Sequence, residues 1–282
     1  MSATGRIRLR CLRPAVEGAT PARRVLLLHG LGNSSGVWRA TTERWNPGTE
    51  VWSADLPWCA DGSPAWCHEP TALQDVSDAL DRLPVRPDVV VGHSFSANLL
   101  LELLSSLRAG GDDIGTRYGV RAIALVCPFY RRSPADFHWE GLPGMLGNFE
   151  RTIQRGIAQH ARREIAADVA DHITRKILDR IGPYGWLRFL ELYARTPWLR
   201  TDLIDVPSLV MIGTRDDTAP PAEGVALAED LPAGRLIEAA GCGHFPMIED
   251  PGPFVEAVEA VPLQPGLAVS ARTSQLPLGA PS

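Results

Sequence analysis

The sequence predicts an α/β protein built on a doubly wound, mostly parallel sheet, and three observations carry this prediction. Short apolar runs such as VLLL and VVV recur along the chain and are almost uninterrupted, as in strands covered on both faces. Each run ends in turn residues, and a segment with helical spacing follows most of them. Strands that alternate with helices are typical of parallel sheets with right-handed crossovers.

The expected elements can be placed in chain order. Strands are expected at 6–12, 24–28, 50–54, 87–91, 120–126, 207–212 and 234–238. Helices are expected at 71–82, 95–108, 221–230 and 251–260. In the first of these helices, Leu73, Val76 and Leu80 recur at helical spacing, and Thr71 is a candidate N-cap.

The stretch from 129 to 205 interrupts the alternation, because it contains no strand signal. Residues 149–181 and 184–195 have helical patterns. Gly182 and Pro183 lie between them, and this pair is typical of the end of one helix and the beginning of the next. We expect this stretch to form a helical lid over the carboxyl edge of the sheet. The α/β core then comprises 1–128 and 206–261, and the Pro/Gly/Ser-rich tail 262–282 is expected to be disordered.

Composition narrows the classes of function. The chain has 282 residues, 45% of them hydrophobic, and a formal net charge of −5, which favours a soluble globular protein and disfavours nucleic acid as a partner. No apolar run approaches the ~18 residues of a membrane span. The N-terminal residues lack the apolar core of a signal peptide, and five scattered cysteines suit reduced thiols, so a cytoplasmic location is expected. The histidine and cysteine spacings indicate no metal, no cofactor is expected, and the oligomeric state stays open.

Polar segments lie where predicted strands end, which is the edge where open α/β sheets bind ligands. The first is HGLGNSS, after the strand at 24–28, and the second is GHSFS around Ser94. The third is the pair GTRDDTAP and GCGHFPMIEDP, which offers Asp216 and His244 after the last two predicted strands. A serine, an imidazole and a carboxylate are the groups that nucleophilic catalysis combines, because the alcohol needs a base and the base needs an orienting partner.

The content and order of these segments resemble the α/β-hydrolase superfamily over roughly residues 24–128 and 206–260, in its lid-containing esterase or thioesterase branch. The resemblance implies that Ser94 is the nucleophile, His244 the general base and Asp216 the acid that orients the base. It assigns the oxyanion-binding N–H groups to Leu31 and Phe95. The implied function is cleavage of an ester, thioester or related acyl bond of a largely apolar small molecule.

Alternatives stay open at this stage. Ser94 and His244 can instead be turn and loop residues, and Asp217 competes with Asp216, although the G-x-x-D-x-x-x-P spacing favours Asp216. The nucleophile motif usually closes with glycine, but here the position holds Ser96, which must shift the helix or find a backbone carbonyl. This departure keeps a second hypothesis open, a non-hydrolytic enzyme on the same scaffold that performs acyl transfer, C–C lyase, cyclase or epimerase chemistry. A binding protein with an inactive pocket is a third.

Tryptophans are the candidate walls of a substrate pocket. Trp58 stands where relatives often have a tight glycine turn, and Trp66 belongs to the same loop. Trp139 and Trp186 come from the expected lid. Packing away from the site is the alternative for all of them. Together they indicate an apolar cavity suited to an acyl chain, a macrocycle or an aromatic ring.

Overall fold

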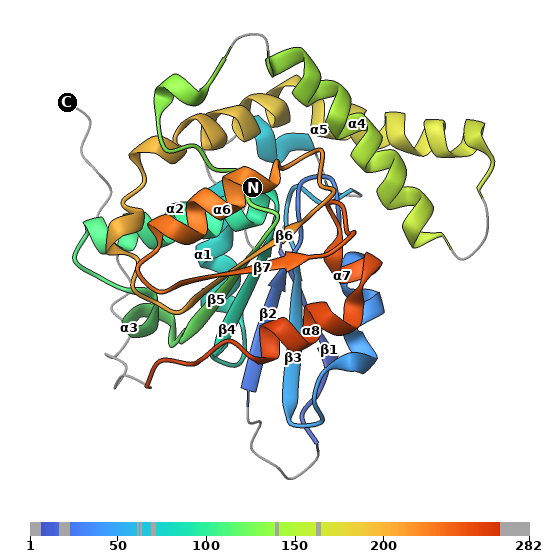
Figure 1. The fold of residues 1–282 in the computed structure, drawn as a ribbon. Helices are drawn as coiled ribbons and strands as arrows, with labels where there is room; N and C mark the ends of the chain where they lie inside the picture. Colours follow the sequence, from blue (N-terminus) through green and yellow to red (C-terminus); the bar gives the residue numbers. More distant parts are fainter. Residues whose placement is uncertain are drawn as a thin grey trace.

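The computed structural model describes residues 7–16, 23–60, 62, 64–68, 72–138, 141–161 and 165–265 (Figure 1). These residues form a seven-stranded sheet with the order β1-β3-β2-β4-β5-β6-β7. β1 pairs antiparallel with β3, and every other pair in this sheet is parallel. The strands are β1 (Arg8–Arg13), β2 (Arg23–Leu28), β3 (Thr49–Asp55), β4 (Val89–His93), β5 (Ala122–Val126), β6 (Ser208–Gly213) and β7 (Gly234–Ala239). The predicted fold class is confirmed.

Helices cover both faces of the sheet, which explains why its central strands are apolar on both sides. Residues 25–28, 89–91 and 122–126 are buried throughout. The 3-10 helix η2 packs against α8 in front of β2 and β3 in Figure 1, whereas α1 and α2 pack against each other on the other face. The covering helices are η2 (Ser35–Arg44), α1 (Ala72–Arg82), α2 (Phe95–Ala109), α3 (Ile114–Tyr118), α6 (Pro221–Asp230), α7 (Pro246–Glu249) and α8 (Pro251–Glu259).

Two further helices, α4 (Gly141–His160) and α5 (Ala167–Ala194), lie between β5 and β6 and pack against each other. Figure 1 shows them across the top of the molecule, beyond the carboxyl ends of the parallel strands. The helix expected over 149–181 is divided into α4, which ends at His160, and α5, which begins at Ala167 and packs against α4. The expected break at Gly182-Pro183 is present as a kink inside α5, where Gly182 has φ 60°.

The chain beyond α8 remains attached to the core through Gln264. The backbone N–H of Gln264 donates to Arg121 O at 3.0 Å, and its side-chain amide donates to Asp205 O at 2.9 Å. The expected tail is therefore ordered through residue 265, and its remainder, 266–282, lies outside the described residues. Among the helices in the described part of the chain, none is both long enough and apolar enough to cross a membrane.

Candidate active site

Ser94 occupies the tight turn between β4 and α2. Its backbone has φ 54° and ψ −120°, a conformation that residues with a side chain rarely adopt. Gly92 permits this turn, because a Cβ atom there would lie 2.9 Å from the backbone N and Cα of Ala97. The strained passage from strand to helix presents the Ser94 hydroxyl at the carboxyl edge of the sheet.

Ser96 occupies the position where the resemblance leads us to expect glycine. Its side chain is completely buried, and its hydroxyl donates a hydrogen bond to the backbone carbonyl of His29, just beyond β2. A backbone acceptor therefore accommodates the departure from glycine. Since His29 precedes Gly30 and Leu31, the same hydrogen bond ties the Ser94 turn to the loop that follows β2.

The structure brings Ser94, His244 and Asp216 together from three separate strand ends. His244 Nε2 lies 3.0 Å from Ser94 Oγ, and His244 Nδ1 lies 2.7 Å from Asp216 Oδ2. When Nδ1–H donates to the carboxylate, Nε2 is left as an acceptor for the hydroxyl hydrogen. All three side chains are buried, and the exclusion of water strengthens both interactions.

The carboxylate of Asp216 is stabilised in its charged form. Its Oδ1 atom accepts hydrogen bonds from the backbone N–H groups of Thr218 at 2.8 Å and Ala219 at 3.0 Å. Burial by itself would raise the pKa of this carboxyl, but the neighbouring His244 ring and the hydrogen bonds lower that pKa below its ordinary value. An ionised Asp216 stabilises the His244 ring when that ring becomes positively charged.

Asp217, the competing carboxylate, contacts a different part of the protein. Its Oδ1 accepts a hydrogen bond from Arg155 Nη1 at 2.8 Å, and its backbone carbonyl accepts one from Asn148 Nδ2 at 2.7 Å. Both donors belong to α4. Asp216, and not Asp217, is the carboxylate that contacts His244.

Leu31 and Phe95, the residues expected to supply oxyanion-binding N–H groups, flank Ser94 on two sides. Leu31 lies in the loop after β2, and Phe95 begins α2. Gly30 allows the loop to approach, since a Cβ there would lie 3.1 Å from the Cβ of Ser94. Among the hydrogen bonds within the described residues, none uses the N–H of Leu31 or of Phe95 as donor. Both N–H groups therefore have no acceptor within the described residues, and the N–H of Phe95 belongs to the first residue of α2, directly after Ser94.

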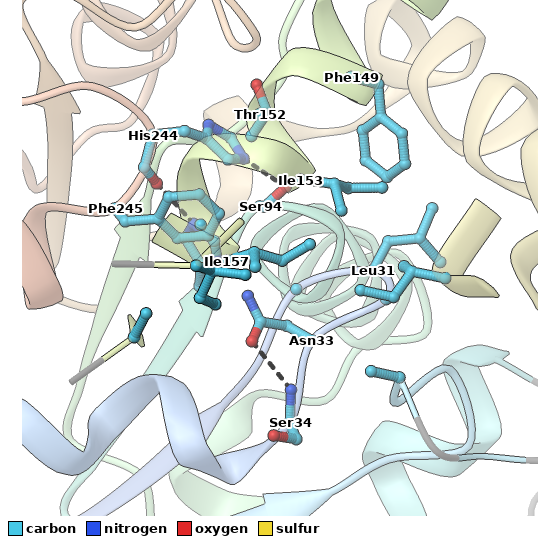
Figure 2. Close-up of a pocket in the computed structure, with 18 residues that line it drawn as sticks. Leu31, Asn33, Ser34, Ser94, Phe149, Thr152, Ile153, Ile157, His244 and Phe245 are labelled. Carbon is cyan, nitrogen blue, oxygen red and sulfur yellow. Dashed lines mark hydrogen bonds between the residues drawn. The ribbon is translucent and has the colours of Figure 1, made fainter. Parts of the chain in front are cut away.

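A cavity of about 360 Å³ opens over Ser94. Figure 2 shows that its lining comes from the loop after β2, from α4 and from the segment that carries His244. Gly156 of α4 leaves room for the ring of Phe245, because a Cβ at Gly156 would lie 3.1 Å from that ring. Most of the wall is apolar and consists of Leu31, Phe149, Ile153, Ile157, Ile165, Ile177 and Phe245. A site of this size and character suits an acyl chain.

Three of the tryptophans expected to form the pocket walls, Trp58, Trp66 and Trp186, do not line this cavity. Trp58 and Trp66 are 1% and 4% exposed, and their rings contact each other and Phe95, because large apolar rings fill the space beneath the nucleophile turn. Trp186 of α5 packs on Phe149 with ring centroids 4.6 Å apart, so it supports a lining residue from behind. Trp139 lies outside the described residues.

His93, which the sequence gives no reason to separate from ordinary packing residues, contacts the His244 backbone. Its Nε2 atom lies 2.8 Å from the carbonyl oxygen of His244, and the side chain is buried. Burial, assisted by the nearby His244 ring, lowers the pKa of His93 to about 3. The ring therefore stays neutral near pH 7, donates through Nε2–H and holds His244 in place without competing for its proton.

Cys127, Asp216 and His244 form a cluster of potential metal-binding atoms within 4.8 Å of one another. Burial raises the pKa of the Cys127 thiol well above its ordinary value, and the Asp216 charge raises it further. Within this cluster, the carboxylate of Asp216 and the imidazole of His244 are hydrogen-bonded to each other. This hydrogen bond accounts for the short distance between Asp216 and His244.

The proton positions decide what this arrangement can do. An alcohol becomes an effective nucleophile when a base accepts its proton during the attack, and His244 Nε2 lies within hydrogen-bonding distance of Ser94 Oγ. Negative charge that develops on a carbonyl oxygen needs N–H donors, a role that the resemblance gives to Leu31 and Phe95. Fold and site together define the class of this protein, the serine hydrolases.

The chain belongs to the alpha/beta hydrolase family, whose model matches residues 25–257. A pimeloyl-[acyl-carrier protein] methyl ester esterase from Aromatoleum aromaticum is 30% identical over 84% of this chain and 97% of its own length. A protein of the same name from Nitrosomonas europaea is 26% identical over 84% of this chain and 94% of its own. Among solved structures, an esterase from Exiguobacterium antarcticum is 16% identical, covers 90% of this chain and 94% of its own, and superposes with a TM-score of 0.63. The last similarity shows the fold alone.

These relatives confirm that the protein is a serine hydrolase that cleaves an ester. The other curated relatives found carry the same esterase name. They support the hydrolytic hypothesis over the acyl-transfer, lyase, cyclase and epimerase alternatives that the Ser96 position had kept open.

Proposed function

We propose that this enzyme hydrolyses an ester of an apolar acyl chain through an acyl-enzyme formed on Ser94. One observation carries the proposal: the hydrogen-bonded series Ser94–His244–Asp216 opens on a cavity of about 360 Å³ with a mostly apolar wall. The acyl chain lies in that cavity, and its carbonyl carbon lies next to Ser94 Oγ.

The residues act in two half-reactions. Ser94 Oγ attacks the ester carbonyl while His244 Nε2 accepts the hydroxyl proton, and Asp216 stabilises the imidazolium that forms. The tetrahedral oxyanion accepts hydrogen bonds from the N–H groups of Leu31 and Phe95, of which each contributes about 3 kcal/mol to the transition state. His244 then gives its proton to the departing alcohol. A water molecule, deprotonated by the same ring, hydrolyses the acyl-enzyme and releases the acid.

The alcohol is proposed to be methanol or another short alcohol. The curated relatives are named for a methyl ester whose acyl chain is attached to a carrier protein. The apolar wall fits the methylene part of such a chain, whereas a large alcohol would compete with the chain for the same space. The partner of the enzyme is therefore a small acyl ester and not nucleic acid, and the five scattered cysteines support a cytoplasmic location.

The helices α4 and α5 are proposed to act as the lid of this site. Isoleucines from both helices line the cavity, so it exists only while they lie over Ser94. Asn148 and Arg155 fasten α4 to Asp217, next to the acid of the triad. This attachment favours the closed arrangement, in which water is excluded from the acyl-enzyme.

The test is the reaction of the wild type and Ser94→Ala with a fluorophosphonate probe and with p-nitrophenyl and methyl esters of increasing chain length. Wild type should be labelled and should turn over the esters, and Ser94→Ala should do neither. Ser106→Ala is the matched control, because Ser106 is an exposed serine on the same helix α2. Hydrolysis in 18O-water should place one labelled oxygen in the acid. Normal turnover by Ser94→Ala would disprove the acyl-enzyme.

A further inference from the structure

Two polar residues of the loop that follows β2 interrupt the apolar wall of the cavity. Asn33 and Ser34 of this loop line the cavity, together with isoleucines of α4 and α5. The backbone of Asn33 is fixed at both ends, because its N–H donates to Gly30 O at 3.2 Å and its carbonyl accepts from Ala60 N at 2.7 Å. Asn33 is therefore held in a defined position on the cavity wall.

The side-chain amide of Asn33 has a definite orientation. Its Oδ1 accepts a hydrogen bond from the backbone N–H of Ser34 at 3.0 Å, and only the oxygen of the amide can accept. The NH2 group must therefore face the other way. Figure 2 shows the Asn33 amide nitrogen turned away from Ser34, on the side where Ile157 lies.

The amide NH2 of Asn33 finds no acceptor within the described part of the protein. Thr152, a polar residue of α4 that also lines the cavity, differs in this respect, because its hydroxyl bonds Asn148 O at 3.0 Å and the hydroxyl of Thr218. When a substrate displaces water from a mostly apolar site, a donor there loses its hydrogen bond to water. The complex is then less stable unless the substrate supplies an acceptor in place of the water.

The acceptor should be neutral. Among the described residues that line the cavity, none is a lysine, arginine, aspartate or glutamate. A free carboxylate brought there would lose its hydration without gaining an opposite charge, which is costly. A carbonyl oxygen of an ester, an amide or a thioester needs only one or two N–H donors, and the Asn33 amide supplies them.

We propose that Asn33 is a specificity-determining residue whose Nδ2 amide donates to a second carbonyl oxygen of the substrate. The preferred substrate is then an ester whose apolar chain carries another carboxyl group, masked as an ester, amide or thioester. This inference rests on the proposed function, since it concerns the acyl chain bound over Ser94.

The experiment compares three methyl esters of equal chain length: one with a plain hydrocarbon end, one with a neutral amide or thioester carbonyl, and one with a free carboxylate. Wild type should prefer the neutral-carbonyl ester over the hydrocarbon ester by roughly three- to tenfold in kcat/KM, the contribution of one neutral hydrogen bond. The difference should appear in KM, because the hydrogen bond is made equally before and during the reaction. The carboxylate ester should be the poorest substrate of the three.

Two variants isolate the NH2 group. Asn33→Asp keeps an oxygen for the Ser34 N–H but has no donor, and Asn33→Leu removes both functions. Both should lose the preference for the neutral carbonyl, measured within each protein as the ratio of kcat/KM for the neutral-carbonyl ester to kcat/KM for the hydrocarbon ester, so that a change in overall activity cancels. If the wild type shows no preference, or the variants retain it, or the carboxylate ester is best, the inference is wrong while the proposed function stands. If no ester is hydrolysed by any of the proteins, the proposed function itself fails.

Discussion

Replacing Ser96 tests how the nucleophile turn tolerates a serine in place of glycine. The Ser96 side chain is buried in α2, directly after the turn, and its hydroxyl donates to the carbonyl of His29. Ser96→Ala removes only that donor. Ser96→Gly removes the donor and the Cβ atom, and it restores the residue that the related motif usually has. The two substitutions therefore separate the hydrogen bond from the backbone requirement.

The expected cost follows from what each change leaves behind. In Ser96→Ala the His29 carbonyl still accepts a hydrogen bond from Trp58 Nε1 at 3.3 Å, so no buried acceptor is orphaned. The loss is then that of one ordinary buried hydrogen bond, about 1 kcal/mol of unfolding free energy. Ser96→Gly adds the helix-propensity cost of glycine, about 1 kcal/mol, and should lose about 2 kcal/mol in total.

Urea unfolding and thermal melts measure these differences. A loss of 1 kcal/mol should lower the melting temperature by about 2–4 °C in a protein of this size. The control is Ser106→Ala, the same change at an exposed position of α2, which should be neutral within about 0.5 kcal/mol. A Ser96→Gly protein as stable as the wild type, or more stable, would refute the reasoning, because it would mean that serine is merely tolerated at this position.

Two further substitutions probe the loops that carry the acid and the base. Gly213→Ala places a Cβ 2.0 Å from the carbonyl oxygen of Gly243, so the segment before His244 must move. We expect a loss of about 1–3 kcal/mol in stability and a roughly 100-fold loss in kcat/KM. The control is Gly252→Ala, whose Cβ would have its nearest neighbour 3.7 Å away, and it should reduce neither stability nor activity. Wild-type kinetics for Gly213→Ala would show that the loop accommodates the added Cβ without displacing His244, and would contradict this reasoning. Asp216→Asn should reduce kcat on the order of 10⁴-fold. Because the pKa of Asp216 is lowered in the folded protein, its carboxylate stabilises the fold above the ordinary value of 3.8, and this contribution is lost as pH falls through the lowered pKa. Urea titrations should therefore show less acid destabilisation in Asp216→Asn than in the wild type, and identical pH profiles would contradict the assignment.

The sheet, and the meeting of Ser94, Asp216 and His244, could be predicted from the sequence for a physical reason. Parallel strands buried on both faces leave long apolar runs, and the carboxyl ends of these runs must converge on one edge. Polar residues that follow such runs are therefore close in space even when they are 150 positions apart in the chain, as Ser94 and His244 are. Topology, rather than local sequence, carries this part of the prediction.

The cavity wall could not be predicted in the same way. Aromatic residues indicate a large apolar volume, but sequence does not reveal whether a ring faces the cavity or fills the core behind it. Trp58 is buried beneath the nucleophile turn, whereas Ile153 and Ile157 of α4, which look like ordinary helix residues in the sequence, line the cavity. The role proposed for Asn33 was equally hidden, because the hydrogen bond from Ser34 that turns its NH2 group is visible only in three dimensions.

The adjacent carboxylates Asp216 and Asp217 connect two functions of one loop, which are the orientation of His244 and the attachment of the helix that lines the acyl-chain cavity. Asp216 accepts hydrogen bonds from His244 and from the backbone of Thr218, while Asp217 accepts one from Arg155 of α4. The hydroxyl of Thr218 in turn contacts Thr152 of α4, a residue of the cavity wall. Any movement of α4 away from Ser94 must break contacts to the residues that immediately follow the acid. A change in the position of α4 therefore changes contacts of Asp217 and Thr218, which directly follow Asp216 in the sequence. For this reason, substitutions in α4 at these contacts should affect both the chain-length preference and the catalytic step.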